Sequence, residues 1–182
     1  MQGLPKKKVL RRLQGHTHTV KCYAYLDIET TGLGRTCGEL AVVGVALVKG
    51  PQSRIDQLVA PEISVDRLLG LLHGADEIYT YNGARFDLPF IKAQLHIDLK
   101  QHLKHTDLMY ACWKQSLKGG LKVVEQRLGI PRKLKGITGY IAVQFWWRYV
   151  NDGGLDALKT LLEYNKEDVL NLEILRKKLR VP

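Results

Sequence analysis

CYAYLDIETTG, residues 22–32, is the stretch of sequence that decides the fold. Its apolar and aromatic first half predicts a β-strand over residues 22–28. Side chains two apart on a strand point to the same face, so Asp27 and Glu29 are expected to lie side by side at its end. Two such carboxylates repel each other, and a divalent cation would resolve the repulsion. For this segment alone, a polar strand end that leads into a turn explains the pair more simply.

A further carboxylate follows the next strand and turn signals. Residues 77–81 (EIYTY) predict a short strand, Asn82 and Gly83 predict a turn, and residues 87–95 predict a helix. Asp87 therefore lies at or near the start of that helix. Aspartate is favoured there as a cap and by the helix dipole, so a structural role explains Asp87 on its own at least as well as a functional one.

The third carboxylate site lies in the helix predicted over residues 155–179, whose leucines form an apolar stripe. At about 3.6 residues per turn, Asp168 is only about 20° from Leu161 and Leu172, so it points toward the core. Tyr164 lies one turn before Asp168 on the same side of the helix. A buried carboxylate needs a partner, and a metal ion, a buried arginine or a backbone donor would each provide one.

The remaining pattern predicts a single α/β domain. We expect the other strands and helices at residues 40–49, 53–60, 64–72, 121–128 and 138–150. Ser64 is the expected cap of the helix that follows it, and the apolar run at residues 40–49 predicts a strand buried on both faces. Strands dominate early and helices later, which indicates a mixed sheet with helices on both faces. This domain spans residues 21–182 and follows a basic N-terminal arm over residues 1–20.

Charge and composition narrow the classes of partner. Among 182 residues, Lys and Arg number 28 against 18 Asp and Glu, and the net charge of +10 favours nucleic acid, an acidic membrane surface or an acidic protein. No apolar run is long enough to span a membrane, and the N-terminal region lacks the apolar core of a secretory signal. Cys22, Cys37 and Cys112 form no CxxC pair, which argues against a disulfide framework or a zinc site and favours a cytoplasmic protein.

The carboxylate sites are more informative together than singly. They lie at a strand end, at a helix start and on a core-facing helix stripe, so one sheet can bring together Asp27, Glu29, Asp87 and Asp168. Converging carboxylates are what a hydrolase needs to hold two cations that act on a phosphate. We therefore expect a two-metal hydrolase that uses Mg²⁺ or Mn²⁺.

Three motifs in this sequence resemble those of the DEDD, or DnaQ-like, exonuclease superfamily, whose fold is RNase H-like. DIETTGL at residues 27–33 is similar to its first motif, NGARFDLPFI at residues 82–91 to its second, and YNKED at residues 164–168 to its third. The third motif has the Tyr-x-x-x-Asp form of the DEDDy branch, because Glu163 stands where the other branch has a histidine. HTDL at residues 105–108 and GGLKVVEQRLGI at residues 119–130 resemble the YprB-type predicted exonuclease domains.

The resemblance, which spans residues 22–179, implies a five-stranded sheet and a 3′–5′ exonuclease. Such an enzyme releases nucleoside 5′-monophosphates from the 3′ ends of single-stranded DNA or RNA. The resemblance implies that Tyr164 orients the attacking water and that two metal ions, Mg²⁺ or Mn²⁺, are held by Asp27, Glu29, Asp87 and Asp168. Contacts with the substrate are expected from Thr30, Leu33, Asn82, Arg85 and Phe86, with Leu33 as a wedge against the terminal base. Asp107 is interpreted as a structural cap beside the site.

Two alternatives remain open from the sequence. The domain could bind nucleic acid or a protein partner without cutting it, or it could act as an endonuclease of the RNase H type. The complete set of carboxylates together with Tyr164 favours the exonuclease. The basic loop with Arg132, Lys133 and Lys135 is a further candidate for phosphate contacts. The sequence does not distinguish a DNA substrate from an RNA substrate, and it identifies no protein partner.

Overall fold

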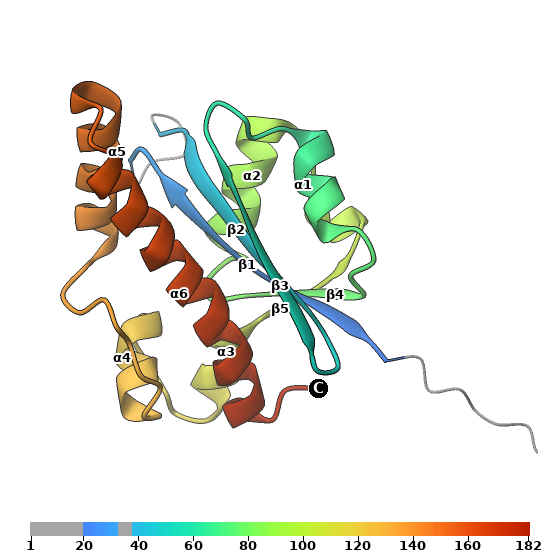
Figure 1. Cartoon of the computed structure of the whole chain (residues 1–182). Coiled ribbons are helices and arrows are strands. Elements are labelled where there is room, and N and C mark those ends of the chain that lie inside the picture. The colour runs from blue at the N-terminus through green and yellow to red at the C-terminus, as the bar shows by residue number, and fades with distance from the viewer. Residues whose placement is uncertain (1–19, 33–37) are drawn as a thin grey trace, which may run out of the picture.

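The computed structural model describes residues 20–32 and 38–182, and this part of the chain forms one mixed sheet in the order β3-β2-β1-β4-β5 (Figure 1). β2 is antiparallel to both β1 and β3, whereas β4 is parallel to both β1 and β5. The strands are β1 (Cys22–Thr30), β2 (Leu40–Lys49), β3 (Gln52–Val59), β4 (Glu77–Thr80) and β5 (Lys104–Asp107). The strand that carries Asp27 and Glu29 is therefore the central one.

Helices cover both faces of the sheet. α1 (Val65–Leu72) and α2 (Asp87–Leu95) pack on one face, and α6 (Leu155–Leu179) crosses the other, as Figure 1 shows. The remaining helices are η1 (Leu99–Gln101), a single 3₁₀ turn before β5, and α3 (Leu108–Lys114), α4 (Leu121–Arg127) and α5 (Gly139–Asp152). This arrangement confirms the expected α/β fold with a mixed five-stranded sheet and helices on both faces.

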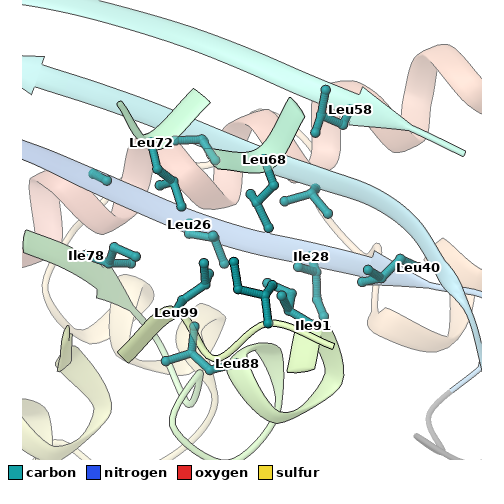
Figure 2. Packing of buried hydrophobic residues seen from close by; sticks show 14 of the residues in the cluster. Leu26, Ile28, Leu40, Leu58, Leu68, Leu72, Ile78, Leu88, Ile91 and Leu99 are labelled. Carbon is teal, nitrogen blue, oxygen red and sulfur yellow. The ribbon is translucent and has the colours of Figure 1, made fainter. Parts of the chain in front are cut away.

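The alternation of side chains along β1 decides where its carboxylates point. Ala24, Leu26 and Ile28 belong to the buried cluster under α1 and α2, of which Figure 2 labels Leu26 and Ile28. Successive side chains of a strand point to opposite faces, so Asp27 and Glu29 point to the face that α6 covers. A slip of one residue would move the whole apolar set out of the core. Burial of the cluster therefore also fixes the direction of both carboxylates.

α6 packs tightly on the sheet at Gly44 of β2, the residue that pairs with Asp27. Asn165 of α6 is fully buried there and donates to the Asp27 carbonyl (3.2 Å) and to the Asp27 carboxylate (2.9 Å). Gln57 of β3 donates to the Asn165 side-chain oxygen (2.8 Å). A Cβ at position 44 would lie 2.1 Å from that oxygen. Glycine therefore permits the helix to approach, and Asn165 holds it above Asp27.

Most expected elements agree closely with the structure. Ser64 caps α1 by accepting from the Arg67 amide (3.3 Å), and β2 is buried along nearly its whole length, as predicted. β5 was not expected from local sequence, because KHTD lacks an apolar alternation, and it becomes a strand by pairing with β4. The basic arm expected over residues 1–20 lies outside the described residues except for its last one. In the described part of the chain, no helix is both long enough and apolar enough to cross a membrane.

The close approach at Gly44 predicts a large effect of one methyl group. Gly44→Ala should lower the free energy of unfolding by about 2 kcal/mol, because the new Cβ must displace the buried Asn165 side chain. Gly70→Ala in α1 is the matched control, since a Cβ there meets nothing within 4 Å and should stabilise the helix by roughly 0.5–1 kcal/mol. Urea unfolding of both variants measures the difference, and equal stabilities would contradict the close approach of Asn165 to Gly44.

Candidate metal centre

β1 and α6 bring three carboxylates together. Asp27 and Glu29 lie near the end of β1, and Asp168 reaches them from α6. One carboxylate oxygen from each of the three lies within 4.8 Å of the others. Asp168 reaches this position because it lies between the fully buried Leu161 and Leu172 on the core-facing side of α6, as the helical spacing predicted. Hard oxygen donors at this separation fit a divalent cation.

The fourth carboxylate is held by a turn rather than by a strand. Asp87 is the first residue of α2 and is buried against the same cavity. The turn before it is fixed by Asp107, whose carboxylate accepts from the backbone N–H groups of Asn82 (2.8 Å), Ala84 (3.0 Å) and Met109 (3.0 Å). Asp107 thus caps α3 and orders the turn that carries Asp87, which confirms its structural interpretation.

All four carboxylates line one cavity of about 160 Å³. Its walls come from both halves of the chain, because β1 and the turn before α2 meet α5 and α6 there. The other lining residues are Ile28, Thr30, Tyr81, Asn82, Phe86, Gly139, Val143 and Tyr164. The cavity is therefore lined by the four carboxylates together with aromatic and apolar side chains.

Burial and mutual repulsion make the charged form of these carboxylates costly. Desolvation, and then the charge of Asp168, raise the pKa of Asp27 and of Glu29 well above their usual values. Desolvation raises the pKa of Asp87 to about 7 and that of Asp168 to about 6, the latter against the opposing charge of Arg132. A bound cation would favour the charged forms, so the electrostatics of the site fit a metal as well as its geometry does.

Arg132 lies against the acidic site from the loop before α5. Its guanidinium forms ion pairs with Asp168 (2.5 Å) and Glu125 (2.8 Å), and a longer one with Glu167 (3.4 Å). Glu125 is fully buried and also accepts from Asn171 (2.9 Å). From the sequence, Arg132 was a candidate for phosphate contacts, whereas in the structure it pairs with carboxylates of the chain itself. Asp168 therefore has the buried arginine that was one of its expected partners, while it still faces Asp27 and Glu29.

Tyr164 lies beside the carboxylates with its hydroxyl bonded to Lys122. The side chain is buried, and burial raises the pKa of the phenol far above its usual value, so the hydroxyl keeps its proton at neutral pH. The Lys122 ammonium donates to this hydroxyl and to the Ile137 carbonyl. An ammonium can only donate, so Tyr164 is the acceptor and its own O–H remains free to donate elsewhere. The geometry suits a residue that positions a water or a phosphate oxygen.

The structure locates most of the residues expected to contact substrate. Thr30, Asn82 and Phe86 line the cavity. Arg85 is exposed on the same turn as Asn82 but is not part of the cavity wall. Leu33, the expected wedge, lies outside the described residues. The structure thus gathers three of these side chains around the carboxylates and leaves Arg85 at the surface.

Two residues of this site were missed from the sequence. Asn165 follows Leu161 by four residues and precedes Asp168 by three. The helical spacing that identified Asp168 as core-facing could therefore also have identified Asn165. Lys122 gave no such signal, because a lysine near the start of a short helix is ordinarily solvated. Desolvation lowers the pKa of Lys122 in the folded protein.

Comparisons with solved structures show similar folds at low identity. A family B DNA polymerase from the hyperthermophilic archaeon Pyrobaculum calidifontis matches 87% of this chain with a TM-score of 0.65 and 16% identity, and the chain covers 24% of that polymerase. NrnC from Brucella melitensis bound to pGG matches 86% of the chain with a TM-score of 0.59 and 22% identity over 71% of its own length. The apo form of a nuclease gives a TM-score of 0.58 at 22% identity, with 86% and 70% of the two chains covered.

The family comparison covers almost the whole described domain. No curated protein matches this chain. The family model RNase_H_2, described as RNase_H superfamily, matches residues 24–180. That range runs from β1 to the end of α6 and contains every carboxylate of the candidate metal centre. Together with the five-stranded mixed sheet, this match shows that the chain belongs to the RNase_H superfamily.

Proposed function

We propose that this protein is a metal-dependent 3′–5′ exonuclease of the DEDDy type, which hydrolyses phosphodiester bonds at the ends of single-stranded nucleic acid and releases nucleoside 5′-monophosphates. One observation carries the proposal: Asp27, Glu29, Asp87 and Asp168 surround a single cavity with Tyr164 in its wall. A fold built on separate elements brings these side chains together although they are far apart in sequence. Such convergence is the usual mark of a catalytic site.

The donor set supports a pair of divalent cations. All four residues offer carboxylate oxygens, the ligands that Mg²⁺ and Mn²⁺ prefer. Asp27, Glu29 and Asp168 are close enough to share one ion, and Asp87 provides a further carboxylate on the same cavity. When bound, divalent cations stabilise charge on a phosphate and lower the pKa of water. Burial, and then repulsion from Asp168, raise the pKa of Asp27 and of Glu29, and bound cations would favour the charged forms.

The residues around the carboxylates have separate tasks in this proposal. Tyr164 donates its free O–H to the attacking water or to a phosphate oxygen, while Lys122 holds the phenol in place. Asn165 keeps the Asp27 carboxylate directed into the cavity. Asp107 orders the turn from which Asn82 faces the substrate. These groups orient the reaction, and none of them needs to change its protonation state.

The resemblance of the motifs supports the finer parts of the proposal. The likeness of residues 27–33, 82–91 and 164–168 to the exonuclease motifs implies the 3′ polarity, the mononucleotide product and the single-stranded substrate. The similar folds include a nuclease and NrnC bound to pGG, although identities of 22% show likeness of fold alone. The net charge of +10 agrees with an anionic substrate.

One observation favours the alternative of a binding module without activity. Arg132 already neutralises Asp168, and Lys122 lies next to Tyr164, so part of the negative charge is balanced by the chain itself. The arginine balances only one of the four carboxylates directly, however, and Asp27 and Glu29 still have strongly raised pKa values. We therefore favour the enzyme, and the next three experiments separate the two functions.

Hydrolysis should depend on added divalent metal and proceed from the 3′ end. With Mg²⁺ or Mn²⁺, a 5′-labelled single strand of DNA or RNA should give a ladder of progressively shorter labelled products on a sequencing gel. Excess chelator should abolish the ladder, and added metal should restore it. Immediate release of the labelled 5′ nucleotide would contradict the proposed polarity, and a ladder that persists in excess chelator would contradict the metal.

Asp27→Asn should abolish most activity and leave the metal-free protein at least as stable. The raised pKa means that folded Asp27 keeps a proton that the unfolded chain loses above about pH 4. Its charge therefore costs stability as pH rises, so the variant should be more stable than the parent at pH 8 and nearly equal to it at pH 4. Denaturant unfolding with a chelator present measures both values.

Asp98→Asn provides a control of opposite sign. The side-chain hydrogen bond from Lys92 and the backbone hydrogen bond from Lys100 lower the pKa of Asp98, so its charge stabilises the fold above about pH 4. Removal of that charge should cause a small loss of stability at pH 8 and leave cleavage unchanged. If Asp27→Asn instead unfolds the protein at every pH, Asp27 is structural and the metal centre is wrong.

Tyr164→Phe should slow the chemical step by about 10- to 1,000-fold, since only the positioning hydroxyl is lost. Metal affinity and substrate affinity should change little, because the ring still fills its place. Single-turnover cleavage at saturating Mg²⁺ measures the effect. Tyr81→Phe is the matched control, because Tyr81 also lines the cavity but its hydroxyl donates to the Gly119 carbonyl (2.6 Å). A Tyr164→Phe rate within about twofold of the parent would show that the hydroxyl has no role in the chemical step and that the ring only packs.

A further inference from the structure

α5 presents two aromatic side chains to solvent beside the candidate metal centre. Tyr140 is 67% exposed and Trp147 is 43% exposed, although aromatic residues of this size ordinarily lie mostly inside. The opposite side of α5 is buried, with Ala142 and Trp146 packed under Leu161 and Tyr164 of α6. The buried side of α5 thus attaches the helix to α6, and most of the Tyr140 ring remains open to solvent.

The exposed aromatic face is continuous with the cavity. Gly139 and Val143 of α5 line the cavity wall. On a helical projection, Trp147 and Tyr140 lie about 40° and about 60° from Val143, both in the same direction. The two rings therefore flank the rim of the cavity on one side. Figure 1 shows α5 beside the N-terminal part of α6, near the end of β1.

Trp147 is held in a fixed orientation by its polar atom. The indole N–H donates to the carbonyl oxygen of Thr31 (3.0 Å), the residue after Thr30 in the cavity wall. Because this is the only donor of an indole, the rest of the ring can offer only its π faces and edges to a ligand. A ring that is already ordered loses little freedom on binding, which favours stacking against a flat partner.

Cationic side chains lie in the loop that precedes this helix. Lys133 and Lys135 are exposed in the loop that leads into α5, and the chain as a whole carries a net charge of +10. Aromatic rings interleaved with lysines form the surface that binds single strands, in which each base has a π face and each linkage a negative charge. A duplex hides its base faces, and an apolar protein surface would not use the lysines. The rings and the lysines together therefore favour a single-stranded nucleic acid as the ligand.

Building on the proposed function, we propose that Tyr140 and Trp147 form a stacking platform for the bases of a single-stranded nucleic acid whose terminal linkage lies in the cavity. The bases next to the scissile linkage stack on the α5 face, and the lysines of the preceding loop contact the phosphates. Stacking does not read base identity, so the platform confers preference for single strands over duplexes without sequence specificity.

Binding in the absence of hydrolysis tests the platform. Fluorescence anisotropy with a labelled 12-nucleotide oligothymidylate, in excess chelator, should show that Trp147→Ala and Tyr140→Ala each weaken affinity by about 5- to 100-fold. Trp147→Phe should retain most of the affinity, because it keeps a ring. Trp113→Ala is the matched control, since Trp113 is 42% exposed on α3, away from the cavity wall, and its loss should change affinity less than twofold.

The outcomes separate the platform from the exonuclease. Selective loss of affinity in Trp147→Ala and Tyr140→Ala supports the platform even if the parent fails to cleave with Mg²⁺, a result that would refute only the proposed function. Parent-like affinity in both alanine variants overturns the platform even if the parent cleaves normally. Unchanged affinity combined with a change in oligomeric state by light scattering would also overturn it, by assigning the face to a second copy of the chain.

Discussion

Repulsion among buried and partly buried carboxylates is the constraint on which the rest of this site depends. Asp27, Glu29, Asp87 and Asp168 would separate if their backbones were free to move, because each disfavours the charged form of its neighbours. They stay together because each belongs to an element whose apolar side is buried elsewhere: β1, α2 and α6. The hydrophobic core thus supplies the free energy that holds an electrostatically unfavourable cluster ready for cations.

A few polar contacts convert this core packing into a defined geometry. Asn165 joins α6 to the backbone and carboxylate of Asp27 above Gly44, and Asp107 joins the start of α3 to the turn that carries Asp87. On the other side of the cluster, Arg132 neutralises Asp168 and is itself held by Glu125. Asn165 and Asp107 satisfy buried polar groups, and Arg132 balances a buried charge, so loss of either partner leaves an uncompensated charge or donor inside the protein.

The sequence by itself determined the elements with regular patterning. In a strand, successive side chains point to opposite faces, and in a helix residues three or four apart share a face. These regularities made the directions of Asp27, Glu29 and Asp168 predictable. Asp87 was predictable as a helix start. β5 was not, because KHTD has no strand pattern of its own and forms a strand only through its bonds to β4. Such pairing depends on a partner distant in sequence.

Only the tertiary structure decided which charges meet. Arg132 lies in a stretch with the composition of a solvated basic loop, yet the fold directs its side chain to Asp168. Packing of distant segments likewise places Lys122 against Tyr164. The exposed rings of Tyr140 and Trp147 also became meaningful only once α5 was found at the rim of the cavity. Local patterns fix the face on which a residue lies. The partner on that face depends on packing between distant segments, which no short stretch of sequence encodes.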